Sequence, residues 1–226
     1  MRQPEKKVKP IRSREDVHRV AEYLRDSHET GEMLRVMFLL GCNTGLRAGD
    51  LRRVKFADIV GKEYFDIIEA KTQKHRRIYI NTALREIIQG YVEYERVKVF
   101  QRERTIVTVT EFFVQDKNCE IITGNKRVAV GVKYMHLLIS DACRELGIEG
   151  NYGSHTMRKT FAYHVYKLCH SLDCVQRLLR HSNRKLTIRY ILDRRSLKYA
   201  RKEFKNSQKE NPPPMSERDL YEINLI

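Results

Sequence analysis

The chain has 226 residues, which is long enough to bury a hydrophobic core and suggests one or two domains. Its 44 Lys and Arg against 29 Asp and Glu give a formal net charge of +15 at pH 7, which favours a polyanion such as nucleic acid or an acidic membrane surface as partner. The longest apolar run, Val36–Leu40, is too short to cross a bilayer, and no apolar segment follows the basic N-terminus, so we expect a soluble protein that is not secreted.

The chain contains five cysteines, at Cys42, Cys119, Cys143, Cys169 and Cys174. Their odd number and the lack of any Cys-x-x-Cys pair indicate reduced thiols, as expected inside a cell. Cys169, His170 and Cys174 form a close group of candidate zinc ligands, but their spacing fits no tetrahedral site with a second ligand pair. The sequence therefore predicts no metal site.

The chain begins with an extended segment and an amphipathic helix. Residues 1–12 are polar and basic with two prolines, so we expect an extended lead-in. Ser13 and Asp16 resemble a capping box, and apolar residues then recur at helical spacing as far as Leu24. This pattern predicts a first helix over residues 14–28.

A second helix and a turn follow. Residues 32–41 are nearly all apolar after the first turn, which is typical of a helix buried on most sides. Asn43-Thr44-Gly45 ends this helix, and Gly45 suits a left-handed turn. Arg47 then begins a short helix, with Asp50 placed where its carboxylate could orient the guanidinium; the alternative is a surface ion pair of little energetic value.

The rest of the chain predicts a β-hairpin and further helices. Residues 64–70 and 76–80 are rich in strand-forming residues and flank a polar turn that carries Lys71 and Lys74. Helical periodicity follows over residues 82–100, 132–146, 155–168, 172–179 and 197–204. We expect residues 105–114 to be a strand or an extended loop, and Tyr190 to lie in or just before another short helix.

The C-terminal end is an apolar tail on a charged chain. Three prolines at 212–214 break the chain, and apolar residues from Leu220 to Ile226 follow. We expect this tail to dock on the chain itself or on a neighbour.

Imidazole, guanidinium and phenol side chains recur at short spacings in the second half of the chain. His155 and Arg158 are three residues apart, so on a helix they project from one face. His181 and Tyr190 are nine residues apart, which suits a helix end, a turn and a short helix. Taken singly, a Tyr or a His is usually a packing or structural group. Together, these side chains could surround one phosphate.

Five motifs occur in a fixed order: Thr44-Gly45-Leu46-Arg47 with Asp50, Lys71 in the hairpin, His155-Thr156-Met157-Arg158, Leu179-Arg180-His181-Ser182, and Arg189-Tyr190. In this order they resemble the catalytic domain of the tyrosine recombinases, the phage integrase family. The resemblance implies a mainly α fold with a small antiparallel β-sheet or hairpin. It makes residues 13–205 the catalytic domain and 206–226 a C-terminal tail that could dock in trans.

The resemblance also implies a chemistry for these residues. Tyr190 would attack a DNA phosphodiester and leave a 3'-phosphotyrosine and a free 5'-hydroxyl. Arg47 and Arg158 would each hold the non-bridging oxygens, because a guanidinium is planar, bidentate and always charged. His155 and His181 would add hydrogen bonds or help to move protons.

The departing 5'-oxygen needs a proton in this mechanism. Lys71 is the implied general acid, with Lys74 as its rival three residues on. Asp50 would have a supporting role beside the guanidinium. Because the phosphotyrosine stores the energy of the broken phosphodiester, the resemblance implies no cofactor, neither ATP nor a metal.

Double-stranded DNA is the implied partner, and strand exchange implies a homo-tetramer on paired sites, whether or not the free chain is a monomer. The chain would act in the cytoplasm or nucleoid of a host cell, as part of a mobile or viral element. Two alternatives are an accessory DNA-binding factor with a recombinase fold and an enzyme that relaxes DNA like a type IB topoisomerase. The presence of all six catalytic residues argues against the accessory factor.

One departure from the family concerns the N-terminal side. Family members usually carry a separate helical core-binding domain, whereas only 46 residues precede Arg47 here. The chain is therefore either a catalytic fragment of a longer integrase or a natural single-domain member.

Overall fold

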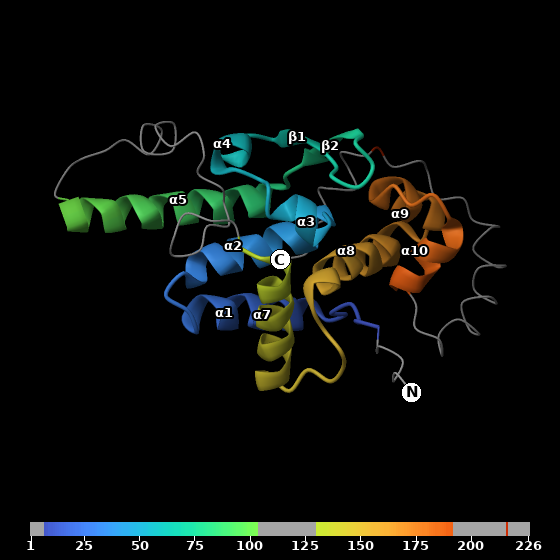
Figure 1. The fold of residues 1–226 in the computed structure, drawn as a ribbon, viewed down its shortest axis with the longest axis horizontal. Helices are drawn as coiled ribbons and strands as arrows, with labels where there is room; N and C mark the ends of the chain where they lie inside the picture. The colour runs from blue at the N-terminus through green and yellow to red at the C-terminus, as the bar shows by residue number, and fades with distance from the viewer. Residues whose placement is uncertain (1–6, 104–129, 192–215, 217–226) are drawn as a thin grey trace.

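A computed structural model describes residues 7–103, 130–191 and 216. Its helices and strands are α1 (Arg14–Asp26), α2 (Gly31–Thr44), α3 (Ala48–Leu51), α4 (Phe56–Ile59), β1 (Tyr64–Ile68), β2 (His75–Tyr79), α5 (Thr82–Glu103), α7 (Val132–Glu145), α8 (Ser154–Cys169), α9 (Leu172–Leu179) and α10 (Arg184–Ile191). Within these residues the protein is mainly helical with one two-stranded antiparallel sheet (Figure 1), which confirms the predicted fold class.

The first helix begins at the predicted capping residue. Ser13 Oγ accepts a hydrogen bond from the Asp16 amide (3.1 Å), which satisfies one donor of the first turn. The buried residues of α1 recur at helical spacing and are Val17, Val20, Ala21 and Leu24. They form the face that packs on α2. The helix ends at Asp26, two residues earlier than predicted.

The other described elements are arranged around α2. Every residue of α2 from Val36 to Thr44 is buried, and the helix contacts α1, α5 and α8. Figure 1 shows α1 and α5 on opposite sides of it. Burial on most sides explains why the sequence of this helix is nearly all apolar.

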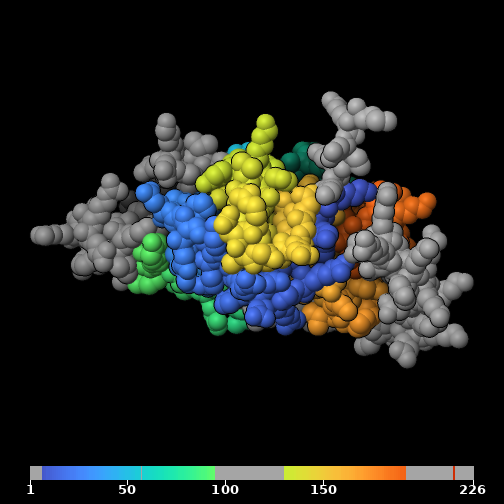
Figure 2. All heavy atoms as spheres, turned by 90° about the horizontal axis from the view of Figure 1, so that it is seen from below, coloured from blue at the N-terminus to red at the C-terminus, as the bar shows by residue number. Residues whose placement is uncertain are grey.

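Residues 7–12 of the N-terminal lead-in are held along α8 by hydrogen bonds. The Ile11 amide donates to Thr160 Oγ1 (3.0 Å), and Lys159 Nζ donates to the Val8 carbonyl (2.7 Å). The Lys9 amide donates to the carbonyl of Asn151, just before α8. Seen from below in Figure 2, this part of the chain, in blue, lies against the yellow segments. The described part of the predicted lead-in, residues 7–12, is therefore part of the packed structure.

The hairpin turns one face toward the protein. In its register Phe65 pairs with Ile78 and Ile67 with Arg76. Because side chains alternate along a strand, these positions share a face, on which Phe65, Ile78 and Arg76 are buried. The alternation continues beyond the strand to Glu69, which has no exposed surface. A charged residue at the inward end of each strand needs a partner inside the protein.

The remaining sequence predictions have mixed outcomes. The short helix α4 was not predicted, and α5 and α8 lie where their periodicity placed them. Residues 105–114, the terminal helix over 197–204, the C-terminal tail and Cys119 lie outside the described residues. None of the helices in residues 7–103 and 130–191 combines the length and apolar composition needed to cross a membrane.

Candidate active site

A glycine turn places Arg47. Gly45 follows α2 with φ of 61°, a left-handed conformation that glycine adopts without strain, as the sequence predicted. A Cβ at this position would also overlap the ring of Phe161 on α8. The chain then turns so that Arg47 is the N-cap residue of α3, with 21% of its side chain exposed. The guanidinium therefore lies at the junction of α2, α3 and α8.

Arg158 lies in the core beneath this junction and is 1% exposed. Its Nη1 donates to the Gly45 carbonyl and its Nη2 to the Leu179 carbonyl (2.6 Å). One guanidinium thus joins the C-terminal ends of α2 and α9, while its Nε makes no hydrogen bond to any described residue. Burial, together with the charges of Arg76 and Arg47, lowers the pKa of Arg158 to about 10. It still carries its charge at neutral pH.

Two buried carboxylates hold Arg47 and the hairpin together. Arg47 Nη1 lies 3.7 Å from Asp50 Oδ2 and 3.1 Å from Glu69 Oε1. Asp50 Oδ1 also accepts the Ala70 amide (2.8 Å), so α3 is tied to the end of β1. Glu69 Oε1 lies 3.5 Å from Arg76 Nη1. The carboxylates therefore hold Arg47 and the two ends of the hairpin turn, at Ala70 and Arg76, in one network.

Glu69 is charged despite its burial. Burial alone would raise the pKa of its carboxyl group, but the Thr72 hydroxyl donates a hydrogen bond to Oε2 (2.7 Å) and opposes this effect. The guanidiniums of Arg47, Arg76 and Arg158 add to the opposition, and the pKa of Glu69 lies below its ordinary value. A fixed negative charge therefore lies under a cluster of three arginines.

The turn between α9 and α10 brings His181 beside Tyr190. The two rings meet edge to face with centroids 4.7 Å apart. His181 Nδ1 lies 3.1 Å from the hydroxyl oxygen of Thr187, a buried residue one turn before Tyr190 on α10. This contact orients the imidazole and leaves Nε2 for another partner. The helix, turn and short helix predicted from the nine-residue spacing are present.

Both predicted histidines favour the neutral form. His155 lies in the first turn of α8 and is an exposed residue; partial desolvation, followed by the charges of Arg158 and Lys159, lowers its pKa. Burial and the charges of Arg158 and Arg47 lower the pKa of His181 to about 4. A neutral imidazole has one donor and one acceptor nitrogen, so each ring can donate one hydrogen bond and accept another at neutral pH.

A cavity of about 750 Å³ opens in front of these groups. Four of the residues predicted for catalysis line it: Arg47, Lys71, His181 and Tyr190. Lys74, the rival of Lys71, lines it as well, so the cavity lining does not decide which of the two lysines is the general acid. Arg158 and His155 are not part of its wall. Arg158 lies behind the wall, and His155 lies beside the cluster at the start of α8.

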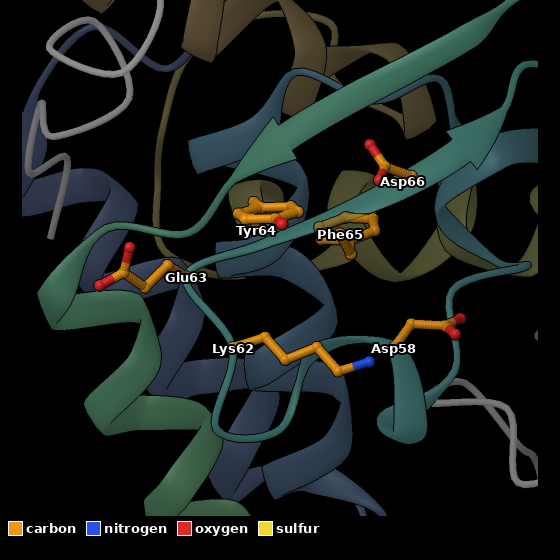
Figure 3. Close-up of a pocket in the computed structure, with 6 residues that line it drawn as sticks. All are labelled: Asp58, Lys62, Glu63, Tyr64, Phe65 and Asp66. Carbon is orange, nitrogen blue, oxygen red and sulfur yellow. The ribbon is translucent and has the colours of Figure 1, made fainter.

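A second hollow, of about 570 Å³, lies at the outer end of β1 (Figure 3). Its lining is Asp58, Lys62, Glu63, Tyr64, Phe65 and Asp66. Three carboxylates against one ammonium give it a negative charge, and no residue predicted for catalysis lines it. It does not suit a polyanion.

Sequence reasoning missed three polar groups that support the site. Glu69 and Arg76 continue the inward-facing alternation of the hairpin, so a period-two reading of the strands would have marked them as buried charges. Lys159 places its ammonium 5.4 Å from the centroid of the Tyr190 ring, within reach of a cation–π contact. Its position next to Arg158 gave no signal in the sequence. No group of three or more potential metal ligands occurs within the described residues.

Comparison with known proteins decides the family. The sequence pattern of the phage integrase family matches residues 13–196. The chain belongs to this family. A relative, the "Probable integrase/recombinase YoeC" of Bacillus subtilis (strain 168), is 30% identical over 186 residues, which cover 81% of this chain and 89% of the relative. The resemblance seen in the motifs is therefore confirmed.

Solved structures of family members share the fold. The XerH site-specific recombinase bound to palindromic difH substrate is 20% identical, with a TM-score of 0.61 over 90% of this chain and 55% of XerH. XerA recombinase is 19% identical, with a TM-score of 0.61 over 94% of this chain and 68% of XerA. A lambda integrase(75-356) dimer bound to a COC' core site gives a TM-score of 0.56 at 19% identity, over 85% of this chain and 62% of that chain. The fold is that of tyrosine recombinase catalytic domains, and the chain spans about half the length of XerH.

Proposed function

We propose that this chain carries the DNA-cleaving and rejoining activity of a site-specific recombinase, with Tyr190 as the nucleophile. The observation that supports this most directly is the meeting of Arg47, Lys71, His181 and Tyr190 around one cavity, with Arg158 behind its wall. These residues come from distant parts of the sequence. A phosphodiester in the cavity would meet a phenol, an ammonium and guanidiniums together.

In the first step, the Tyr190 oxygen bonds to phosphorus and the bond to the 5'-oxygen breaks. Arg47, which lines the cavity, would bind the non-bridging oxygens, and the buried charge of Arg158 behind the wall would help to stabilise them. The phenolic proton passes to a neutral imidazole, for which His181 is well placed. His155 would hydrogen-bond the phosphate from the first turn of α8.

In the same step the leaving 5'-oxygen takes a proton from Lys71. Lys71 lies in the exposed hairpin turn and lines the cavity, as general acid catalysis requires. Lys74, which also lines the cavity, is the alternative general acid. The reverse reaction, by the 5'-hydroxyl of a second strand, rejoins the DNA and restores both protons. The phosphotyrosine conserves the bond energy throughout.

DNA is the substrate that the charge and the relatives support. The net charge of +15 favours a polyanion, and the XerH and lambda integrase structures hold DNA substrate sites. Exchange between two sites would need a tetramer, because four strands must be cut. We assign residues 13–205 to the catalytic domain and 206–226 to a tail that docks on a neighbouring subunit.

The test is covalent trapping on a nicked suicide DNA substrate. We expect the Tyr190→Phe variant to form no adduct while it keeps its affinity for DNA, because affinity depends mainly on phosphate contacts by the basic surface. Tyr134→Phe, which changes an exposed tyrosine on α7, is the matched control and should form the adduct normally. A denaturation-resistant adduct in the Tyr190→Phe variant would overturn the assignment.

A further inference from the structure

Arg180 has a backbone conformation that its side chain disfavours. It is the C-cap residue of α9, and its φ of 49° lies in the left-handed region. Glycine is the usual residue at such a helix end, and a residue with a Cβ is strained there. Strained residues persist where the surrounding structure holds them, and they often mark a functional site. A glycine at position 180 would avoid the strain, so the arginine side chain is expected to have a role of its own.

The side chain of Arg180 reaches across to the hairpin. Its Nη1 donates a hydrogen bond to the backbone carbonyl of His75, the first residue of β2. Arg180 and His75 both line the cavity, together with Lys71 and His181. Figure 1 shows the hairpin beside α9, as this bond requires. One side chain thus joins the lysine hairpin to the turn that carries His181.

The two segments that Arg180 joins differ in how they are held. The His181 turn is fixed by its own bonds: the His181 amide donates to the Gln176 carbonyl (3.0 Å), and Gln176 Nε2 donates to the His181 carbonyl (3.0 Å). The hairpin is held on its β1 side by the Asp50 carboxylate, which accepts the Ala70 amide. Arg180 contacts the other side of the hairpin, at the start of β2.

We propose that Arg180 is a positioning residue that clasps the β2 side of the hairpin and thereby holds Lys71 in place against the Tyr190 side of the cavity. The inference rests on the proposed function, because it takes Lys71 as the general acid. Through Lys71, Arg180 then affects the protonation of the leaving 5'-oxygen and not the attack by Tyr190. The alternative is that the Arg180 guanidinium simply contacts a DNA phosphate, and the experiment must distinguish this role from the positioning of Lys71.

The experiment measures single-turnover adduct formation at saturating DNA, on ordinary DNA and on DNA with a bridging 5'-sulfur. A thiolate leaves without a proton, so sulfur DNA bypasses the general acid. Arg180→Gly fits the left-handed backbone, so its Tm should stay within about 2 °C of the parent. We expect it to be about 10-fold slower on ordinary DNA, the effect of one lost hydrogen bond, and to match the parent on sulfur DNA.

Three further variants make the result specific. Arg180→Lys keeps one donor for the His75 carbonyl and should retain most of the rate on both substrates. Arg177→Ala removes a charge from the same helix at an exposed residue outside the large cavity, and it should resemble the parent. Lys71→Ala should be slow on ordinary DNA and recover on sulfur DNA.

The outcomes separate the two proposals. If Lys71→Ala recovers on sulfur DNA and Arg180→Gly does not, the clasp is wrong and the proposed function stands. If Arg180→Gly weakens DNA binding and leaves the saturated rate unchanged, Arg180 is a phosphate contact and the clasp is again wrong. If Lys71→Ala fails to recover, the general acid has been misassigned, and the clasp falls with that part of the proposed function.

Discussion

Replacing Glu69 by Gln tests the charge network beneath the cavity. The substitution keeps the size of the side chain and removes the negative charge that lies 3.1 Å from Arg47 and 3.5 Å from Arg76. The positive charge of the buried Arg158 remains in the same cluster. We therefore expect the Glu69→Gln variant to be less stable and to hold Arg47 less firmly.

The size of the effect follows from burial. Removing one member of a buried ion pair usually costs about 3–5 kcal/mol, because the remaining charge is left uncompensated. Arg47 is 21% exposed and keeps Asp50 as a partner at 3.7 Å, so we expect about 3 kcal/mol, near the lower end of that range. For a domain of this size the loss corresponds to a fall in Tm of about 6–12 °C.

The effect also has a predictable pH dependence. The pKa of Glu69 is lower in the folded protein than in the unfolded chain, so its charge stabilises the fold above the unfolded value of about 4.3. This contribution is lost as the pH falls through the folded pKa. The difference in free energy of unfolding between the parent and Glu69→Gln should be constant from neutral pH to mildly acid pH and shrink below about pH 4.

Thermal and urea unfolding of both proteins across this pH range are the measurements. Asp66→Asn is the matched control, because Asp66 lies on β1, shortly before Glu69, and pairs with Arg77 at 3.0 Å, with both side chains about half exposed. An exposed pair of this kind contributes little to stability, because water screens the two charges. If Glu69→Gln is no less stable than Asp66→Asn, or if its deficit does not depend on pH, the network does not support Arg47 as argued.

Two other predictions concern the turn and the imidazole. Gly45→Ala should destabilise the protein by about 2 kcal/mol or more, because alanine disfavours the left-handed φ and its Cβ would overlap Phe161; Gly49→Ala, where a Cβ meets open space, should be nearly neutral in the same thermal unfolding assay. As the pH falls from about 6.5 toward about 4, the parent should lose stability, because the folded protein resists protonation of His181. The His181→Gln variant should lose less free energy of unfolding over the same pH range, as measured by urea unfolding. Parallel curves of unfolding free energy against pH for the two proteins would contradict the assigned cause.

The sequence by itself determined the helices and the motifs they carry. Ser13 and the apolar spacing that follows predicted α1, because a capping hydroxyl and a period of 3.6 residues act within one helix. Gly45 predicted the left-handed turn before Arg47 for an equally local reason. The spacing from His181 to Tyr190 predicted the turn between α9 and α10. Such features depend on residues a few positions apart, so a linear sequence displays them.

The strand pattern also contains a signal for two buried charges. Glu69 and Arg76 sit at inward positions of the hairpin, and the rule of alternation marks them as buried. The sequence could not say that Glu69 pairs with Arg47, because this ion pair depends on how the hairpin docks on α3. Thr187 is similar, since its contact with His181 depends on the angle of the turn between two helices.

Tertiary structure alone decided which of the motif residues share a cavity. Packing of α8 on α2 places Arg158 behind the wall, between the Gly45 and Leu179 carbonyls, and leaves His155 outside the lining. The hydrogen bond from Arg180 to His75 joins residues 105 positions apart. Contacts of this range depend on the course of the whole backbone and on close packing between helices, and no local pattern of residue types encodes them.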